Sequence, residues 1–415
     1  MYLLLLWLGK LIQKATRLFH NSGSALPGLV IERFMPKFLE KALLKLPDGV
    51  IVISGTNGKT TTTKIVAETL QKLGERVMTN TSGSNMTRGL ISAVVRRSKL
   101  FGQLPFDVAV LEVDEAYAAV LAKKVPIRAA LVLNVMRDQL DRFGEIDTTA
   151  EYLGQLTRAV SQVVVLNADD QRVAKLPTKS SAKRVYFGAS ESLRKNLKSD
   201  DEWHGLAQKS VVKADIKLES SSGFNVGISG QEKTVLKLEG VHNHLNFVAA
   251  FGLLTSLKPE IEQKRLIDVM STTAPAFGRG ERVKVGDSTF DIQLVKNPSS
   301  FTQTVRAARL DVYKTVTIAI NDSYADGRDV SWLWDADVDK FKNVAELFTA
   351  GTRRYDMAVW LKYSEIKTSD IFASESEIIA ELTKKAGVHA IFCTYTAMMS
   401  LRKELVRLGH AERIA

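Results

Sequence analysis

The run from Val50 to Thr63, V-I-V-I-S-G-T-N-G-K-T-T-T-T, restricts this chain to few folds. Four β-prone residues lead into a turn bounded by Gly55 and Gly58, and Lys59 and Thr60 then open a helical pattern. Glycine permits the tight turn and brings backbone N–H groups close to phosphate oxygens. Lys59 can reach terminal phosphates, and Thr60 can bind Mg²⁺ at a helix N-terminus whose dipole favours an anion. The run therefore predicts a strand, a phosphate-binding loop and a helix start.

The loop differs from the common P-loop, because two residues rather than four separate its glycines. This shorter form makes a chance match less plausible than a generic glycine loop would. We expect the nucleotide to contact Gly55, Thr56, Asn57, Gly58, Lys59, Thr60 and Thr61.

Near-continuous Val, Ile and Leu runs around the loop are typical of strands buried on both faces of a parallel sheet. They predict an α/β fold with a doubly wound, P-loop-type central domain, whose ligands bind at the carboxyl ends of the strands. Strands are expected at 50–54, 76–79, 108–113, 129–135 and 163–166, and helices at 61–73, 86–97 and 243–257.

A second alternation begins near Ser288 and predicts a smaller, Rossmann-like α/β C-terminal domain. Strands are expected at 291–295, 315–320, 357–360 and 390–394, and helices at 301–310, 338–350, 376–386 and 397–408.

Composition shifts between these patterns suggest the domain boundaries. Residues 1–46 form an N-terminal helical segment, and 47–275 form the central domain, in which polar residues 195–237 read as a small β-rich insertion. The A-F-G-R-G-E stretch places a hinge at 276–285, and the C-terminal domain occupies 286–415.

The net charge of +11 suggests polyanionic partners, such as phosphorylated substrates or anionic lipids. Nucleic acid is disfavoured, because there is no zinc-finger pattern, basic-aromatic run or basic tail. The one cysteine, Cys393, lies in the apolar run A-I-F-C-T-Y, which predicts a buried thiol rather than a nucleophile. A single thiol also fits a reducing cytoplasm.

The N-terminus predicts a basic amphipathic helix. Met1 to Leu8 is apolar, but Lys10 follows too soon for a bilayer-spanning helix, and the positive residues come after the apolar run, unlike those of a signal peptide. Leucines recur at helical spacing, so the helix covers the core of a domain or lies on an anionic membrane. We favour docking on the protein.

Acidic residues follow the predicted strands at the edge that carries the loop. Glu112 ends a strand where an Mg²⁺ ligand is expected. Asp114 and Glu115 come next and fit a solvated loop equally well. Asp138 either places a metal or nucleotide or caps a helix, and Asn243 opens a helix next to the nucleotide domain.

These motifs, taken in order, resemble those of the Mur ligase superfamily. The matching runs are G-T-N-G-K-T-T-T (55–62), Glu112, L-N-V-M-R-D-Q-L-D (133–141), L-N-A-D-D (166–170), G-V-H-N-H-L-N (240–246) and G-R-G-E (278–281).

Further runs are similar to the MurT family within that superfamily. They are G-S-A-L-P-G (23–28), L-V-K-N-P (294–298), N-D-S-Y-A-D-G-R-D-V-S-W-L-W-D (321–335), R-R-Y-D-M-A-V-W-L-K-Y (353–363) and T-A-M-M-S-L-R-K (396–403).

The resemblance implies ATP-dependent amidation of the D-glutamate α-carboxylate in the lipid II stem peptide, giving D-isoglutamine through an acyl phosphate. It implies ATP and Mg²⁺ as cofactors, and a GatD-like glutaminase that supplies ammonia within a heterodimer. It also implies a cytoplasmic enzyme at the inner face of the cell membrane, where peripheral membrane contact is possible.

The resemblance also implies roles for single residues. Lys59 and Thr60 would hold phosphates and Mg²⁺, and Glu112 would bind Mg²⁺. Asn243 would lie near the adenine, and Arg279 near the nucleotide at the hinge.

An aspartate of this chain would complete a Cys-His-Asp triad whose other members belong to the glutaminase. We assign this role to Asp335, with Asp329 and Asp337 as rivals.

Two departures from the family pattern limit what can be carried over. Many MurT proteins carry a four-cysteine zinc ribbon, but residues 195–237 contain no cysteine, so no zinc is expected. Gln139 stands where other Mur ligases place a histidine, so the resemblance does not extend to a second Mg²⁺ held by that side chain.

Two other functions remain open from the sequence. One is an amide ligase that adds an amino acid, as other Mur ligases and folylpolyglutamate synthases do. The other is a non-catalytic nucleotide-binding scaffold, against which the intact G-K-T run and Glu112 argue.

Overall fold

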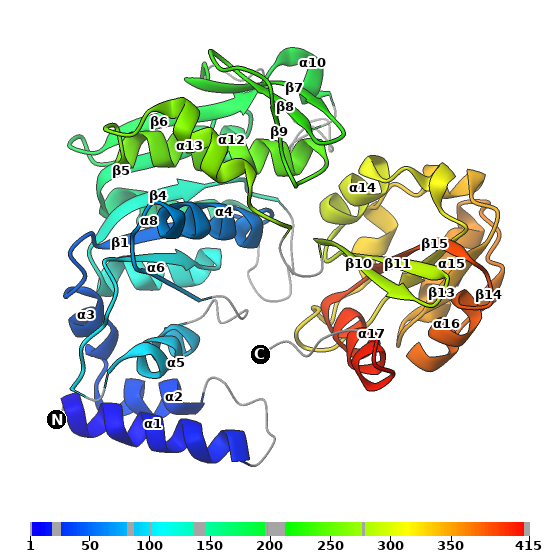
Figure 1. Ribbon diagram of the computed structural model, residues 1–415, viewed down its shortest axis with the longest axis horizontal. Coiled ribbons are helices and arrows are strands. Elements are labelled where there is room, and N and C mark those ends of the chain that lie inside the picture. The colour runs from blue at the N-terminus through cyan, green and yellow to red at the C-terminus, as the bar shows by residue number, and fades with distance from the viewer. Residues whose placement is uncertain are drawn as a thin grey trace. The chain divides into compact units, whose positions relative to one another are not determined.

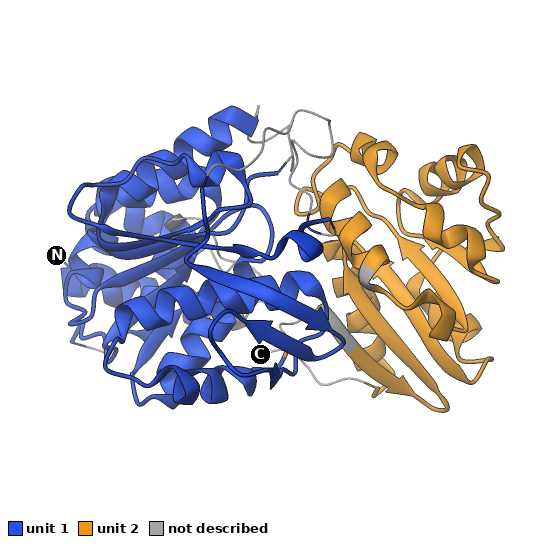
Figure 2. Ribbon diagram, turned by 90° about the horizontal axis from the view of Figure 1, so that it is seen from above, with its two compact units in different colours: residues 1–136, 146–274 blue, residues 137–145, 275–415 orange. Residues whose placement is uncertain are grey.

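A computed structural model describes residues 2–18, 26–80, 87–99, 101–136, 146–195, 197, 212–275 and 279–410. The chain divides into two compact units (Figure 2). Unit 1 comprises residues 1–136 and 146–274, and unit 2 comprises 137–145 and 275–415.

Unit 1 is built on a sheet with nine described strands in the order β2-β3-β1-β4-β5-β6-β7-β8-β9 (Figure 1). Neighbours from β2 to β7 pair in parallel, and β7, β8 and β9 pair antiparallel. The strands are β1 (Val50–Ser54), β2 (Val77–Thr79), β3 (Val108–Glu112), β4 (Ile127–Val132), β5 (Val160–Asn167), β6 (Lys183–Ala189), β7 (Ile216–Ser222), β8 (Asn225–Ile228) and β9 (Thr234–Val235).

Helices cover both faces of this sheet. Side chains alternate between the faces of a strand, so Val50 and Val52 enter one hydrophobic core while Ile51 and Ile53 enter the other. The first core is completed by α1 (Tyr2–Leu18), α2 (Leu26–Phe34), α3 (Phe38–Leu43), α5 (Thr87–Arg97), α6 (Glu115–Lys124) and α8 (Ile146–Ala159). The second is completed by α4 (Lys59–Lys72), α12 (Val241–Leu257) and α13 (Gln263–Ser271). Two single-turn helices, α9 (Gln171–Ala174) and α10 (Glu191–Arg194), follow β5 and β6.

Unit 2 contains a second sheet, with the described strand order β10-β11-β15-β12-β13-β14. The strands pair in parallel except β10, which is antiparallel to β11. They are β10 (Arg279–Val285), β11 (Ser288–Leu294), β12 (Thr315–Ala319), β13 (Leu347–Ala350), β14 (Asp370–Ile371) and β15 (Gly387–Cys393).

Helices again cover both faces of the sheet in unit 2. On one face pack α14 (Pro298–Ala307), α15 (Arg354–Tyr363) and the 3-10 helices η2 (Ser331–Asp335) and η3 (Asp339–Asn343). On the other pack α16 (Glu375–Leu382) and α17 (Tyr395–Arg407), and η1 (Leu310–Val312) precedes β12. The predicted fold class, a doubly wound domain followed by a smaller Rossmann-like one, is confirmed.

Four local predictions need correction. The expected β-rich insertion at 195–237 is, where described, the antiparallel continuation β7–β9 of the main sheet. Residues 279–285 of the expected hinge form β10, which pairs with β11. The expected helix at 338–350 is η3 followed by β13, and the expected strand at 357–360 lies inside α15.

Candidate active site

The glycine loop between β1 and α4 closes tightly against two other elements. Gly55 has a φ of 125° and Gly58 a φ of 87°, a region that side chains strain to enter. A Cβ atom on Gly55 would lie 2.9 Å from the Asn134 carbonyl oxygen, and one on Gly58 would lie 2.4 Å from Asn246 Oδ1. Both positions therefore need glycine, and the loop is held between the end of β4 and the first turn of α12.

Lys59 folds back into this loop. Its Nζ donates to the Gly55 carbonyl at 2.6 Å and forms ion pairs with Asp114 at 3.2 Å and Glu115 at 3.5 Å. The lysine is buried, so two carboxylates compensate a charge that would otherwise be costly away from water. The ammonium is thus fixed inside the loop, where an incoming phosphate would meet it.

Two further contacts brace the loop against neighbouring strand ends. Thr56 Oγ1 donates to Glu115 Oε1 at 3.0 Å. Asn134, which follows β4, accepts the Asn57 N–H at 2.8 Å and donates to the Asn57 carbonyl at 3.1 Å. The carboxyl ends of β3 and β4 therefore set the loop conformation before any nucleotide arrives.

Thr60 and Glu112 form the candidate Mg²⁺ site. Thr60 Oγ1 donates to Glu112 Oε1 at 3.0 Å, across the gap between α4 and β3. Asn80, after β2, fixes the Glu112 backbone by donating to its carbonyl at 2.7 Å and accepting its N–H at 2.9 Å. The described residues contain no group of three or more His, Cys, Asp or Glu side chains arranged for a metal. A cation held here would share one hydroxyl, one carboxylate, phosphate oxygens and water, the ligand set typical of Mg²⁺.

The start of α4 fits a phosphate group. Gly58 gives this helix no side-chain cap, so its first N–H groups have no capping side chain at that position. Thr61 Oγ1 is buried and has no hydrogen-bond partner among the described residues. Open donors at a helix N-terminus, beside Lys59, are the features that bind nucleotide phosphates.

The structure brings together the predicted loop residues, Lys59, Thr60 and Glu112, but it describes other predicted residues elsewhere. Asn243 lies in the first turn of α12, where its Nδ2 donates to the Glu239 carbonyl at 2.7 Å. Its neighbour Asn246, rather than Asn243, approaches the loop at Gly58. Arg279 begins β10 in unit 2, and its side chain lies outside the described residues, as do Asp138 and Gln139.

The three candidate triad aspartates lie close together in unit 2 but have different surroundings. Asp335 ends η2, is exposed, and forms no hydrogen bond or ion pair with any described residue. Asp329 accepts the Ser331 N–H at 2.8 Å, which lowers the pKa of its carboxyl. Asp337 is paired with Arg306 Nη2 at 2.6 Å. Of the three, Asp335 has the carboxylate most open to a partner.

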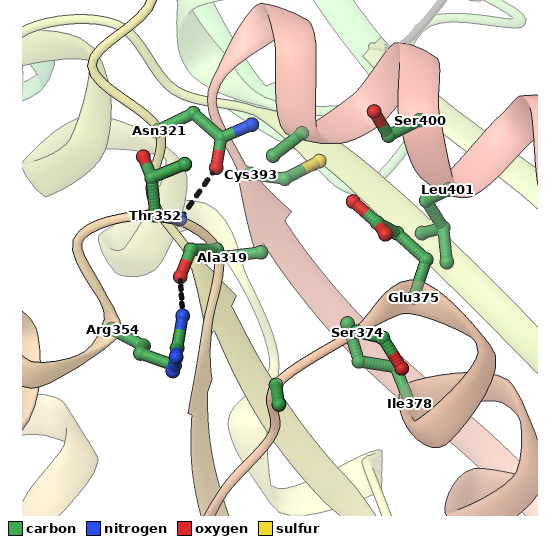
Figure 3. Close-up of a pocket in the computed structure, with 13 residues that line it drawn as sticks. Ala319, Asn321, Thr352, Arg354, Ser374, Glu375, Ile378, Cys393, Ser400 and Leu401 are labelled. Carbon is green, nitrogen blue, oxygen red and sulfur yellow. Dashed lines mark hydrogen bonds between the residues drawn. The ribbon is translucent and has the colours of Figure 1, made fainter.

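A polar cavity of about 290 Å³ opens at the carboxyl ends of β12, β13 and β15 in unit 2 (Figure 3). Asn321, on its wall, accepts the Thr352 N–H at 2.8 Å and donates to Thr396 Oγ1 at 3.0 Å. The buried carboxylate of Asp326 accepts the Thr396 N–H at 2.8 Å. These bonds tie the 321–335 motif to the start of α17, so the two runs form one structure.

Four residues at the loop were not predicted to act there. Asn80, Asn134, Asn246 and Asp170 each contact the loop or the strand ends around it, and Glu115 was left as an undecided acid. Asn134 and Asp170 do lie in strand-end runs that the sequence marked as polar, but nothing local marks Asn80 or Asn246.

Asp170 joins the end of β4 to the start of α9. Its Oδ2 accepts the Val135 N–H at 2.7 Å, and its Oδ1 accepts those of Arg172 at 3.0 Å and Val173 at 3.2 Å. Burial raises the pKa of this carboxyl to about 6, and the three N–H donors oppose that rise without cancelling it.

This shift predicts a pH-dependent stability. The folded chain holds the Asp170 proton more tightly than the unfolded chain, so the contribution is complete below about pH 4 and is lost as pH rises through 6. Between pH 4.5 and pH 7, the wild type should lose about 2 kcal/mol of unfolding free energy relative to Asp170→Asn. Urea unfolding at both pH values measures this. Asp147→Asn, at an exposed site, is the control, and parallel curves for the wild type and Asp170→Asn would contradict the assignment.

Comparison with known proteins finds similarity along most of the chain. Residues 53–254 match the family described as Mur ligase middle domain, and residues 294–398 match the family described as MurT ligase C-terminal. The lipid II isoglutaminyl synthase (glutamine-hydrolyzing) subunit MurT of Staphylococcus aureus (strain COL) is 28% identical over 431 residues, covering 96% of this chain and 97% of that protein. The subunit of the same name from Streptococcus pneumoniae (strain ATCC BAA-255 / R6) is 28% identical over 422 residues, with 92% of each chain covered.

Solved structures show the same fold. A crystal structure of MurF from Acinetobacter baumannii superposes with a TM-score of 0.68, covering 92% of this chain and 81% of that one. The two sequences are 16% identical, so this likeness concerns the fold alone.

Proposed function

Because the chain belongs to the Mur ligase superfamily and carries a C-terminal domain of the MurT type, we propose that it is the ligase subunit of a lipid II isoglutaminyl synthase. The subunit uses ATP to convert the D-glutamate α-carboxylate of the lipid II stem peptide into the amide of D-isoglutamine. It works in the cytoplasm, at the inner face of the membrane that holds its lipid-linked substrate.

The observation that carries this proposal is the arrangement of Lys59, Thr60 and Glu112 around an uncapped helix N-terminus. A carboxylate is a poor electrophile, and transfer of a phosphoryl group to it creates an acyl phosphate with a good leaving group. Lys59 and the N–H groups of α4 position the phosphates and stabilise charge as the phosphoryl group moves. Mg²⁺, when bound, adds charge neutralisation at the same oxygens.

The nitrogen comes from a second subunit. Cys393 is the chain's one cysteine, and it is fully buried between β11 and β12. Burial and the nearby Asp326 charge raise the pKa of its thiol well above the ordinary value, so it provides no thiolate nucleophile. Glutamine hydrolysis by a cysteine therefore requires a partner, which we propose is a GatD-like glutaminase forming a heterodimer with this chain.

The metal role of Glu112 predicts a changed Mg²⁺ requirement. Glu112→Gln keeps an acceptor for Thr60 but removes the negative charge, so ATP hydrolysis should need about 10- to 100-fold more Mg²⁺ for half-maximal rate. A magnesium titration of ATPase rate measures the shift. Glu68→Gln, on the outer side of α4, should titrate like the wild type. An unchanged Mg²⁺ requirement in Glu112→Gln would remove Glu112 from the site.

The reaction itself is tested by changing the nitrogen source. With ATP, lipid II and ammonium chloride, the chain alone should form the amide; with glutamine as nitrogen source, product should appear only after the glutaminase is added. Mass spectrometry of the stem peptide distinguishes the outcomes. Replacement of one carboxylate by an amide supports the proposal, whereas addition of a whole amino acid indicates an amino-acid-adding ligase. ATP consumption without any change in the peptide, or no consumption at all, contradicts it.

A further inference from the structure

The outward face of helix α1 is apolar. Leu5 and Leu6 point into the first core of unit 1, and a Cβ on Gly9 would lie 2.6 Å from Ile31 Cδ1, so this face packs tightly on α2. The opposite face exposes Leu3, Leu4, Trp7, Leu8 and Leu11. We call these five residues the α1 stripe.

The α1 stripe is continuous and strongly exposed. Its spacing follows the helical repeat, so the five side chains lie side by side along one face. Leu4 is 68% exposed, Trp7 48% and Leu11 65%, values far above those usual for such large apolar groups. In Figure 1, α1 runs along the rim of unit 1, with α2 and α5 on its inner side. The helices that pack on α1 therefore leave the stripe uncovered.

Positive charge surrounds the stripe. Residues 1–46 contain seven Lys and Arg residues and two Glu residues. Lys45 Nζ lies 4.9 Å from the centroid of the Tyr2 ring, at the start of α1, and the exposed Lys14 continues the stripe toward its end. An apolar face with a tryptophan and basic residues beside it is the pattern of a helix that lies in the interface of an anionic bilayer.

We infer that α1 is a peripheral membrane anchor that inserts the α1 stripe among the acyl chains of anionic lipids. No helix in the described ranges is long and apolar enough to cross a bilayer, so α1 lies flat. A 17-residue helix spans about 26 Å along the surface. Five side chains on one helix make a small surface beside the roughly 800 Å² per partner of a stable protein interface, whereas a bilayer accepts a single helix.

The inference sharpens the sequence-based expectation that the N-terminal helix docks on the protein. One face of α1 does dock there, through Leu5, Leu6 and Gly9, while the stripe remains for the membrane. Both alternatives weighed from the sequence thus apply, each to one face of the same helix.

Vesicle sedimentation tests the anchor. The full chain should pellet with vesicles of phosphatidylglycerol and phosphatidylcholine, and more weakly with phosphatidylcholine alone or in high salt. Leu4→Gln with Leu11→Gln should lower the vesicle partition coefficient by about tenfold or more. Phe224→Gln with Val235→Gln, at exposed apolar sites on the β7–β9 extension, is the matched control and should pellet like the wild type.

Two further readings separate membrane insertion from other uses of the stripe. On anionic vesicles the tryptophan emission should shift to the blue, and Trp7→Phe should lose this shift while still pelleting. Thermal unfolding must match the wild type for each variant. A wild type that stays in the supernatant, or a double variant that pellets normally, overturns the inference.

Other occupants of the stripe give distinct outcomes. A dimer in solution that Leu4→Gln with Leu11→Gln converts to a monomer would assign the stripe to a second copy of the chain. Binding that requires the co-purified glutaminase rather than lipid would assign it to that subunit. Either result overturns the membrane anchor. The vesicles contain neither lipid II nor nucleotide, so these results are independent of whether the amidation proposal holds.

Discussion

Replacing Lys59 by alanine should reduce ATP-dependent amidation by about 100- to 1,000-fold, the usual effect of removing one preorganised charge from a transition state. The ammonium is held at the centre of the glycine loop by the Gly55 carbonyl, Asp114 and Glu115. Without it, two acidic groups face the incoming phosphates and repel them. The rate of product formation with saturating ammonium chloride measures the loss without involving the glutaminase.

The variant also removes the cation that compensates two carboxylates, so its stability needs separate measurement. Lys59→Met keeps the length of the side chain and should be as inactive, while thermal unfolding shows whether it is folded. Lys64→Ala, one turn further along α4, should retain wild-type amidation. If folded Lys59→Met amidates lipid II at the wild-type rate, the chain is not the phosphoryl-transferring subunit and the nucleotide-binding scaffold becomes the better interpretation.

Replacing Asp335 by asparagine should slow glutamine hydrolysis in the heterodimer by roughly two to four orders of magnitude. An aspartate in such a triad orients a histidine and stabilises its protonated form, and asparagine can do neither. The effect should be absent from the ammonium-dependent reaction, because that reaction bypasses the glutaminase. Glutamate release by the complex, compared with amidation from ammonium chloride, separates the two activities.

Asp339→Asn provides the matched control, since Asp339 is an exposed aspartate on η3, the next 3-10 helix, and its charge pairs with Lys342. Unaltered glutamine hydrolysis in Asp335→Asn would move the role to Asp329 or Asp337. Asp337→Asn would also break the pair with Arg306 on α14, so a loss there counts only if the thermal unfolding is unchanged.

The sequence predicted the centre of unit 1 well, because the strands there have little choice. The run V-I-V-I-S becomes β1 with unchanged bounds, since β-branched residues buried on both faces leave no polar side to expose. The glycine loop, Lys59, Thr60 and Glu112 were placed together for a similar reason. Parallel strands bring their carboxyl ends to one edge, so strand order need not be known.

Predictions failed where a short segment suited both helix and strand. Residues 344–350, V-A-E-L-F-T-A, contain good helix formers, yet Leu347–Ala350 becomes β13 because it pairs with β12 and is buried on both faces. Conversely, M-A-V-W at 357–360 looks β-prone, but Met357, Trp360 and Leu361 share one buried helical face of α15. The 3.6-residue period was present there and was overlooked.

The unpredicted site residues are those that tertiary contact alone brings to the loop. Asn80 acts by holding the Glu112 backbone, and Asn246 by filling the space above Gly58. Neither has a local pattern that distinguishes it from a turn or cap residue. Glu115 looked like one of several solvated acids until the fold placed it, buried, beside Lys59 and Thr56.

Strand β1 is sealed between two apolar layers and flanked by β3 and β4. Its amide protons can reach solvent only when the whole unit opens, so they should be among the slowest to exchange with deuterium. The loop that grows from it cannot melt by itself at its β1 end. Any physiological control of this enzyme must therefore act on access to the loop, since the loop's foundation is as durable as the unit itself.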